Sequence, residues 1–372
     1  MNFYLPTKFA FHKGLHPNFS GMLDPEQNTL FVVSETLMNN RSDLLDYLPA
    51  NTCTYSNVGS NPDIKALQDV EIPQGTKQVV GLGGGSKLDA AKVLFARSLV
   101  SDKYSIKELI QQPSLLDMAK SKRNDFSLIQ LPTTFGSSSE ITKWGTVWDW
   151  EEKKKYSVSH DLLYADHALI YPDLSLTAPF DVTAYTGLDT LSHAIESYWN
   201  VNSNVLSKQF SLKSITLCLA TLPELLKNLH SRELRYVMAE ASVLAGLAFS
   251  QTKTAGAHAI SYPLTLHHDI PHGYACSLTL GAIFDLNIRK QPDLEEVLEI
   301  FRLNYGSSNT PFNECFQAFL ISCNVPSTIS KFNVTKNDIP RLAKESFHPD
   351  RINNMHHKLT LEDIEKILSS VL

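Results

Sequence analysis

The first half of the chain alternates short apolar runs with amphipathic stretches. Four apolar runs end in polar or glycine residues, as buried strands do: 29–35 (TLFVVSE), 77–85 (KQVVGLGGG), 126–134 (FSLIQLPTT) and 167–173 (HALIYPD). Between the second and third of these runs, residues 86–99 (SKLDAAKVLFARSL) have the apolar spacing of a helix. Strands that alternate with helices predict a mostly parallel sheet covered on both faces.

Beyond about residue 175 the pattern changes. Apolar residues recur three and four positions apart over long windows, for example in 183–199, 205–229 and 232–252, and strand signals are few. This spacing predicts helices. We therefore expect an α/β domain over residues 1–175 and an all-helical domain over residues 176–372.

Composition and charge restrict the class of protein. The chain has 372 residues, of which 43% are apolar and 19% charged, as in an ordinary globular protein. A net charge of -6 without a block of like charges gives no sign of a nucleic-acid partner. Five cysteines without a C-x-x-C spacing favour reduced thiols, and no signal peptide or membrane-spanning run is present. We expect a cytoplasmic protein without a nucleic-acid or membrane partner.

Three glycines and a serine, Gly83 to Ser86, join a predicted strand to a predicted helix. Free backbone N–H groups at the positive end of a helix dipole form an anion site. The missing side chains would let a pyrophosphate come close to the backbone. A tight turn without a ligand explains these glycines equally well, and the run does not match the G-x-G-x-x-G fingerprint.

A carboxylate and several histidines form a second group. Asp189 and His193 are four residues apart, so a helix would place them one turn apart on one face. His258 and His272 are fourteen residues apart and are framed by small residues. One carboxylate with several imidazoles is a natural donor set for a divalent transition metal, although a single histidine is more often a hydrogen-bonded structural residue. We keep the structural interpretation for two neighbouring histidines, His267 and His268.

Four sequence blocks together resemble the iron-containing alcohol dehydrogenase family. They are the glycine junction with Asp89 and Lys92, residues 131–142 (LPTTFGSSSEIT), residues 186–199 (TGLDTLSHAIESYW), and residues 257–273, which contain AHAISYPL and IPHG. The blocks follow the family's order at similar spacing and span most of the chain. The resemblance implies a dehydroquinate synthase-like architecture, with a dinucleotide-binding domain, a helical metal domain and a cofactor in the cleft between them. It also implies a homodimer.

The resemblance implies which residues form the sites. The metal ligands would be Asp189, His193, His258 and His272. The cofactor-binding residues would be Ser34, Gly84, Gly85, Ser86, Thr133, Thr134, Ser137 and Lys155. Among these, the glycines and Ser86 would hold the pyrophosphate, and the two threonines with Ser137 would line the nicotinamide side.

The sequence departs from the family pattern at three places. Tyr262 stands where the family often carries a second histidine, so we expect its hydroxyl to relay the proton, with water as the alternative. Residues 135–140 read FGSSSE in place of AGTGSE, which would change the shape of the cleft near the nicotinamide. Ser34, followed by Glu35, stands where NAD-preferring members often carry an aspartate, which leaves both NAD and NADP open.

The expected reaction is hydride transfer between a nicotinamide cofactor and a small aldehyde or primary alcohol, assisted by a Lewis-acidic metal. The resemblance implies Fe(II), although zinc accepts the same ligands. Two alternatives stay open. One is a zinc-dependent enzyme of the same fold, similar to glycerol dehydrogenase or dehydroquinate synthase. The other is a catalytically silent, metal-stabilised binding protein.

A finer resemblance concerns the substrate. Residues 140–159 are similar to a subgroup associated with phosphonate metabolism, whose members reduce phosphonoacetaldehyde to 2-hydroxyethylphosphonate. Lys143 and the lysines at 153–155 would offer positive charge to a dianionic headgroup. A generic short aldehyde or alcohol is the alternative substrate.

Overall fold

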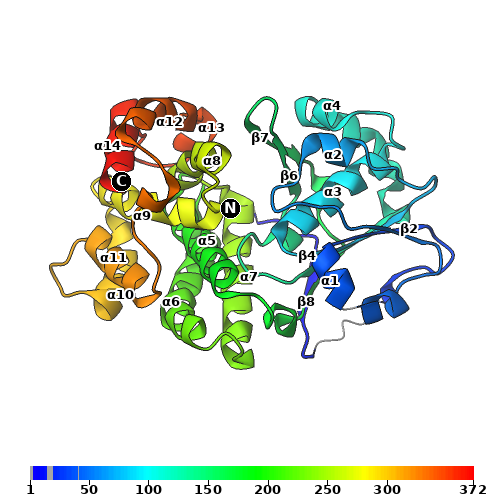
Figure 1. Cartoon of the computed structure of the whole chain (residues 1–372), viewed down its shortest axis with the longest axis horizontal. Coiled ribbons are helices and arrows are strands. Elements are labelled where there is room, and N and C mark those ends of the chain that lie inside the picture. The colour runs from blue at the N-terminus through cyan, green and yellow to red at the C-terminus, as the bar shows by residue number, and fades with distance from the viewer. Residues whose placement is uncertain (1–2, 15–19, 41) are drawn as a thin grey trace. The chain divides into compact units, whose positions relative to one another are not determined.

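The computed structural model describes residues 3–14, 20–40 and 42–372. The chain divides into two compact units. The α/β unit comprises residues 5–134 and 138–175, and the helical unit comprises residues 1–4, 135–137 and 176–372. Figure 1 labels the elements of both units.

The α/β unit is built on a six-stranded sheet within the described part of the chain, in the order β1-β8-β5-β4-β2-β3, and all its paired strands are parallel. The strands of the sheet are β1 (Lys8–Phe11), β2 (Thr29–Val33), β3 (Thr52–Tyr55), β4 (Gln78–Gly83), β5 (Ser127–Pro132) and β8 (His167–Ile170). A separate antiparallel hairpin consists of β6 (Trp144–Asp149) and β7 (Lys154–Ser159). The helices of this unit are α1 (Glu35–Asn40), α2 (Ile64–Gln68), α3 (Gly85–Leu99) and α4 (Ile106–Gln111).

The central strands are buried on both faces, which explains their unbroken apolar sequence. Successive side chains of β2 alternate between two separate cores because strand side chains point to opposite faces in turn. Leu30 and Val32 enter the core that contains α3, whereas Phe31 and Val33 enter the core on the other side. The predicted mostly parallel sheet is therefore confirmed.

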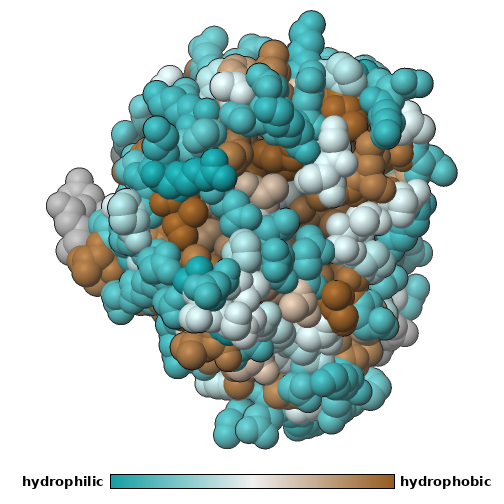
Figure 2. Space-filling model, turned by 90° about the vertical axis from the view of Figure 1, so that its left-hand side faces the viewer, coloured by the Kyte–Doolittle hydropathy of each residue, from teal (hydrophilic) through white to brown (hydrophobic). Residues whose placement is uncertain are grey.

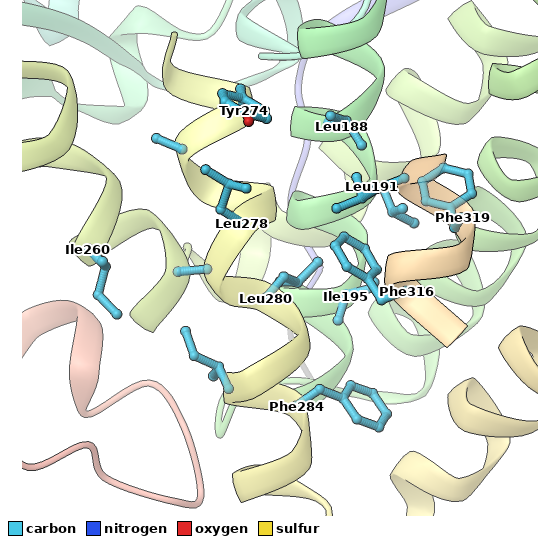
Figure 3. Packing of buried hydrophobic residues seen from close by; sticks show 14 of the residues in the cluster. Leu188, Leu191, Ile195, Ile260, Tyr274, Leu278, Leu280, Phe284, Phe316 and Phe319 are labelled. Carbon is cyan, nitrogen blue, oxygen red and sulfur yellow. The ribbon is translucent and has the colours of Figure 1, made fainter. Parts of the chain in front are cut away.

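The helical unit packs around α5 (Phe180–Trp199), which contacts α6 (Val205–Lys227), α7 (Arg232–Thr252) and α9 (His272–Asn287). The further helices are α8 (Gly256–His268), α10 (Glu295–Tyr305), α11 (Phe312–Ser322), α12 (Ile339–Ser346), α13 (Pro349–Ile352) and α14 (Leu361–Ser370). Figure 3 shows apolar side chains of α5, α9 and α11 meeting in one core, among them Leu191, Phe284 and Phe316. This unit confirms the predicted helical C-terminal half.

The surface shown in Figure 2 carries apolar areas that polar side chains separate. Two of the large apolar side chains that are well exposed lie on α10 and α11, namely Leu303 and Ile321. No helix within the described ranges of the chain is long and apolar enough to cross a lipid bilayer.

Candidate functional site

Three helices of the helical unit bring the four expected metal ligands together. Asp189 and His193 lie one turn apart on α5, His258 lies in the first turn of α8, and His272 is the first residue of α9. His258 Nε2 lies 3.0 Å from His193 Nε2 and 3.6 Å from Asp189 Oδ1. The rings of His258 and His272 have centroids 5.4 Å apart. Ligand atoms of Asp189, His258 and His272 lie within 4.8 Å of one another, and His193 joins this group through its contact with His258.

Gly273 explains why α9 can begin so close to α5. A Cβ atom at this position would lie 2.1 Å from the carbonyl oxygen of Tyr185 and 2.7 Å from Cβ of Asp189. Any larger residue would push apart the two helices that carry His272 and Asp189. The glycine of the IPHG block is therefore required by helix packing at the ligand cluster itself.

The donor set fits a divalent cation. Asp189 Oδ1 is buried and has no hydrogen-bond partner among the described residues, which is costly for a carboxylate unless a cation is present. Burial favours a higher pKa for Asp189, but the neighbouring imidazoles, His193 foremost, bring that pKa below its usual value. Burial also lowers the pKa of His193 to about 4, so this ligand is neutral at pH 7, as metal binding requires.

The second ring nitrogen of each histidine is already held. His193 Nδ1 lies 3.2 Å from the carbonyl oxygen of Gly136, and His272 Nδ1 lies 3.1 Å from Ser261 Oγ. His258 Nδ1 lies 2.7 Å from a carboxylate oxygen of Glu196, a fully buried residue of α5. Such partners fix the orientation and tautomer of ligating imidazoles. They leave each Nε2 available for a metal.

Sequence reasoning missed Glu196. Its carboxylate also accepts hydrogen bonds from the backbone N–H groups of Ala255, Ala257 and His258, at the start of α8. The residue thus connects α5 to α8 as well as orienting His258. A signal was present, because Glu196 follows His193 by three residues and therefore shares its helix face.

A cysteine also lies at the ligand cluster, and sequence reasoning used it only to infer reduced thiols. Ligand atoms of Cys276, Asp189, His258 and His272 all lie within 4.8 Å of one another. Cys276 is buried, one turn after His272 on α9, with Sγ 3.9 Å from both ring nitrogens of that histidine. Burial raises the pKa of its thiol.

Tyr262 lies beside the cluster, one turn after His258 on α8. Its ring stacks on that of His272, with centroids 6.0 Å apart and planes 23° apart.

The two histidines given a structural interpretation lie at the end of α8, where His267 pairs with Glu345. His268 is the last residue of that helix.

The expected nucleotide-binding residues of the α/β unit gather at the carboxyl ends of three neighbouring parallel strands. Ser34 follows β2, Gly84 follows β4, and Thr133 and Thr134 follow β5. The register pairs Val33 with Leu82 and Gly83 with Pro132, so these strands end side by side. In open parallel sheets, ligands bind at this edge.

The glycine junction begins helix α3 as expected. Gly84 is the N-cap and forms no side-chain cap, and Gly85 is the first helical residue. A Cβ atom on Gly84 would lie 3.0 Å from Thr134 Oγ1, so the strand end after β5 closely approaches this turn. The Ser86 hydroxyl donates to the carbonyl oxygen of Ser60.

Two other expected cofactor-binding residues do not lie directly after strands β2, β4 or β5. Ser137 belongs by its contacts to the helical unit, next to Gly136. Lys155 lies on β7, with Nζ 5.2 Å from the centroid of the Trp148 ring. Burial raises the pKa of Asp89, and the positive charge of Lys155 is one of the smaller influences in the opposite direction. Lys155 therefore lies near α3, the helix that the glycine junction begins.

Lys92 has a positioning role that its motif alone did not reveal. This fully buried ammonium donates to the carbonyl oxygens of Ser139 and Trp144, both at 2.6 Å, and to Thr142 Oγ1 at 3.0 Å. Asp89 accepts from the Ser139 hydroxyl at 2.5 Å. The pair connects α3 to the segment that follows the expected nicotinamide-binding residues.

Comparisons with known proteins show that this fold belongs to a class of oxidoreductases. The sequence matches the family described as iron-containing alcohol dehydrogenase over residues 6–172, and its C-terminal part over residues 183–372. It is 30% identical to long-chain-alcohol dehydrogenase 1 of Geobacillus thermodenitrificans, over 74% of this chain and 69% of that protein. The chain belongs to the iron-containing alcohol dehydrogenase family, as the resemblance implied.

Two further similarities involve sulfoacetaldehyde reductases. The chain is 27% identical to that of Bilophila wadsworthia, over 83% of this chain and 81% of the relative. The crystal structure of the enzyme from Bifidobacterium kashiwanohense in complex with NAD+ matches with a TM-score of 0.86 at 25% identity, covering 100% of this chain and 98% of that one. The predicted fold class and enzyme class are thereby confirmed.

Proposed function

We propose that this protein reduces a small aldehyde with NADH at a divalent metal held by Asp189, His193, His258 and His272. The observation that carries the proposal is the buried cluster in which Asp189 Oδ1 lacks a hydrogen-bond partner among the described residues and three imidazoles have their Nδ1 atoms held. The metal, when bound, supplies Lewis-acid polarisation of a carbonyl group. Fe(II) is proposed from the family, and zinc is the alternative.

NADH is proposed over NADPH because of the end of β2. The hydroxyl of Ser34 accepts from the backbone N–H of Leu37, so it caps α1 at the sheet edge. Glu35, next to it, is exposed and would repel a 2′-phosphate. The NAD+ complex of the similar sulfoacetaldehyde reductase supports the same preference.

The residues around the cluster divide the remaining tasks. Glu196 and Ser261 hold two of the imidazoles, and Tyr262, whose ring stacks on that of His272, offers its hydroxyl as the proposed proton donor to the product. At the sheet edge, Gly84 and Gly85 present backbone N–H groups of α3 to the pyrophosphate. The nicotinamide supplies the hydride.

The proposed substrate is a short aldehyde with an oxyanion group, such as phosphonoacetaldehyde or sulfoacetaldehyde. The names of two similar proteins support this class. Two of the lysines expected to recognise the anion already have partners within the α/β unit. Lys143 forms an ion pair with Asp161 at 2.7 Å, and Lys155 lies over Trp148.

The test is a turnover assay with purified protein that has been stripped of metal and then reloaded anaerobically with Fe(II) or Zn(II). Loss of NADH absorbance is followed with propionaldehyde, sulfoacetaldehyde and phosphonoacetaldehyde, and NADPH replaces NADH in a parallel series. We expect metal-dependent reduction that favours NADH. No turnover of any aldehyde with either metal would contradict the proposal.

A further inference from the structure

A buried thiol lies among the expected metal ligands, although the proposed reaction does not use it. Cys276 follows His272 by four residues on α9, so the two side chains share one face of that helix. Its Sγ atom lies 3.9 Å from both ring nitrogens of His272, and the residue is fully buried. The thiol therefore faces the ligand cluster and not solvent.

Cys276 belongs to a group of four residues with mixed donor atoms. Ligand atoms of Cys276, Asp189, His258 and His272 all lie within 4.8 Å of one another. Zinc bonds of about 2.0–2.3 Å in tetrahedral geometry place the donor atoms roughly 3.3–3.6 Å apart. The widest separation in the group must therefore close by about 1–1.5 Å around an ion. Rotation about the single side-chain torsion of the cysteine can move its sulfur by this much.

A second, independent observation shows that the surroundings of the thiol suit a cation. A buried free cysteine often acts only as a small apolar side chain. Here the group that contains Cys276 also contains Asp189, which is buried and whose Oδ1 has no hydrogen-bond partner among the described residues. An apolar cysteine leaves this carboxylate oxygen uncompensated, whereas a cation bound by both side chains compensates it. The chain's other buried cysteines lie outside the group, namely Cys218, Cys315 and Cys323.

We propose that in the substrate-free protein Cys276 is a fifth ligand of the metal, bound through its sulfur. The inference rests on the metal centre of the proposed function and adds a thiolate to its carboxylate and imidazoles. On binding, the S–H bond breaks, a sulfur–metal bond forms and the proton leaves to solvent, and no electron is transferred. Thiolate is a soft ligand that suits zinc, whereas carboxylate suits harder ions. The sulfur therefore adds affinity for zinc that the other four ligands do not provide.

The test uses Co(II) as a spectroscopic probe, added under argon to metal-free protein without substrate. Every protein carries Cys53→Ser, because Cys53 is exposed and a surface thiol would also bind the probe. A sulfur–cobalt bond gives a charge-transfer band in the near ultraviolet that nitrogen and oxygen ligands do not give. We expect this band in the parent, its loss in Cys276→Ser and Cys276→Ala, and its retention in the matched control Cys218→Ser, which replaces another fully buried cysteine.

Zinc affinity gives a second readout, measured by competition with a chromophoric chelator. Loss of a ligand should cost more than the roughly 10- to 100-fold that loss of an outer partner costs, so Cys276→Ser should bind Zn(II) more than about 100-fold more weakly. Cys218→Ser should keep the parent's affinity. Circular dichroism checks the fold of each variant. If neither variant of Cys276 folds, the cobalt spectrum of the parent still decides.

A parent that binds Co(II) without the charge-transfer band would overturn the inference, because nitrogen and oxygen atoms alone would then hold the ion. If His193→Ala abolishes that binding, the metal centre of the proposed function stands without the thiol. A band that persists in a folded Cys276→Ala protein, or an unchanged zinc affinity in Cys276→Ser, would also contradict the assignment. A band that depends on Cys276 in a protein that reduces no aldehyde would support the ligand while the proposed function fails.

Discussion

Replacement of Glu196 by glutamine tests how the ligand cluster is held. Each carboxylate oxygen of Glu196 accepts two hydrogen bonds, one pair from Ala257 N and His258 N, the other from Ala255 N and His258 Nδ1. Glutamine has the same shape but replaces one oxygen with a donor. Whichever way its amide turns, two buried donors lose their acceptor.

The expected losses follow from this geometry. An unsatisfied buried donor costs about 1–3 kcal/mol, so Glu196→Gln should lower the free energy of unfolding by roughly 2–6 kcal/mol. Loss of the partner that orients a ligating imidazole typically lowers metal affinity by about 10- to 100-fold, or about 1.4–2.8 kcal/mol. Burial favours a higher pKa for Glu196, but His258 and the backbone N–H groups outweigh it and lower that pKa, so at neutral pH a full negative charge is lost as well.

Metal affinity is measured by competition with a chromophoric chelator, and stability by denaturant unfolding of the metal-free protein. The matched control is Glu299→Gln, which removes an exposed carboxylate that pairs with Arg302 at 2.7 Å. This control should change neither quantity. A folded Glu196→Gln protein with the parent's metal affinity and stability would refute the role assigned to Glu196.

Three further predictions concern separate parts of the molecule. Gly85→Val should weaken NADH binding by well over tenfold, or more than about 1.4 kcal/mol, because the valine side chain keeps the pyrophosphate away from the backbone. An unchanged affinity in a fluorescence titration would show that the glycines only form a tight turn. Tyr262→Phe should keep its metal but lose roughly 10²–10⁴-fold in turnover, and full activity would leave water as the proton donor. Glu140 is buried, and burial raises its pKa from 4.5 to about 7. The parent should therefore lose on the order of 3 kcal/mol of stability relative to Glu140→Gln as the pH rises from 4.5 to 7; parallel unfolding curves for the two proteins across that range would argue against this shift.

The fold could be predicted because its signals are local. The unbroken apolar runs of β2 and β4 fit strands buried on both faces, and the long windows of three- and four-residue spacing fit helices such as α5. Both are properties of neighbouring residues. They do not depend on which distant segments meet.

The ligand cluster could be predicted only in part from the sequence. The pair Asp189 and His193 follows from helix periodicity, but the approach of His258 and His272 to that pair is set by the packing of three helices and came from the resemblance. No spacing rule connects residues 258 and 272 to the pair on α5. Such tertiary neighbours appear only once the chain is folded.

The lysines show a limit of the sequence pattern. Lys143 and the lysines at 153–155 suggested an anion site by their charge alone. In the fold, Lys143 pairs with Asp161 and Lys155 lies over an indole ring. A charge count along the chain cannot show which charges already have partners.

The most direct test of the central proposal is a crystal structure of the metal-loaded protein, with anomalous diffraction recorded on both sides of the absorption edge of the added metal. We predict one strong anomalous peak within bonding distance of Asp189 and of the Nε2 atoms of His193, His258 and His272. A protein that is fully loaded by elemental analysis but shows its peak elsewhere, with these four side chains unbound, would contradict the proposed metal centre.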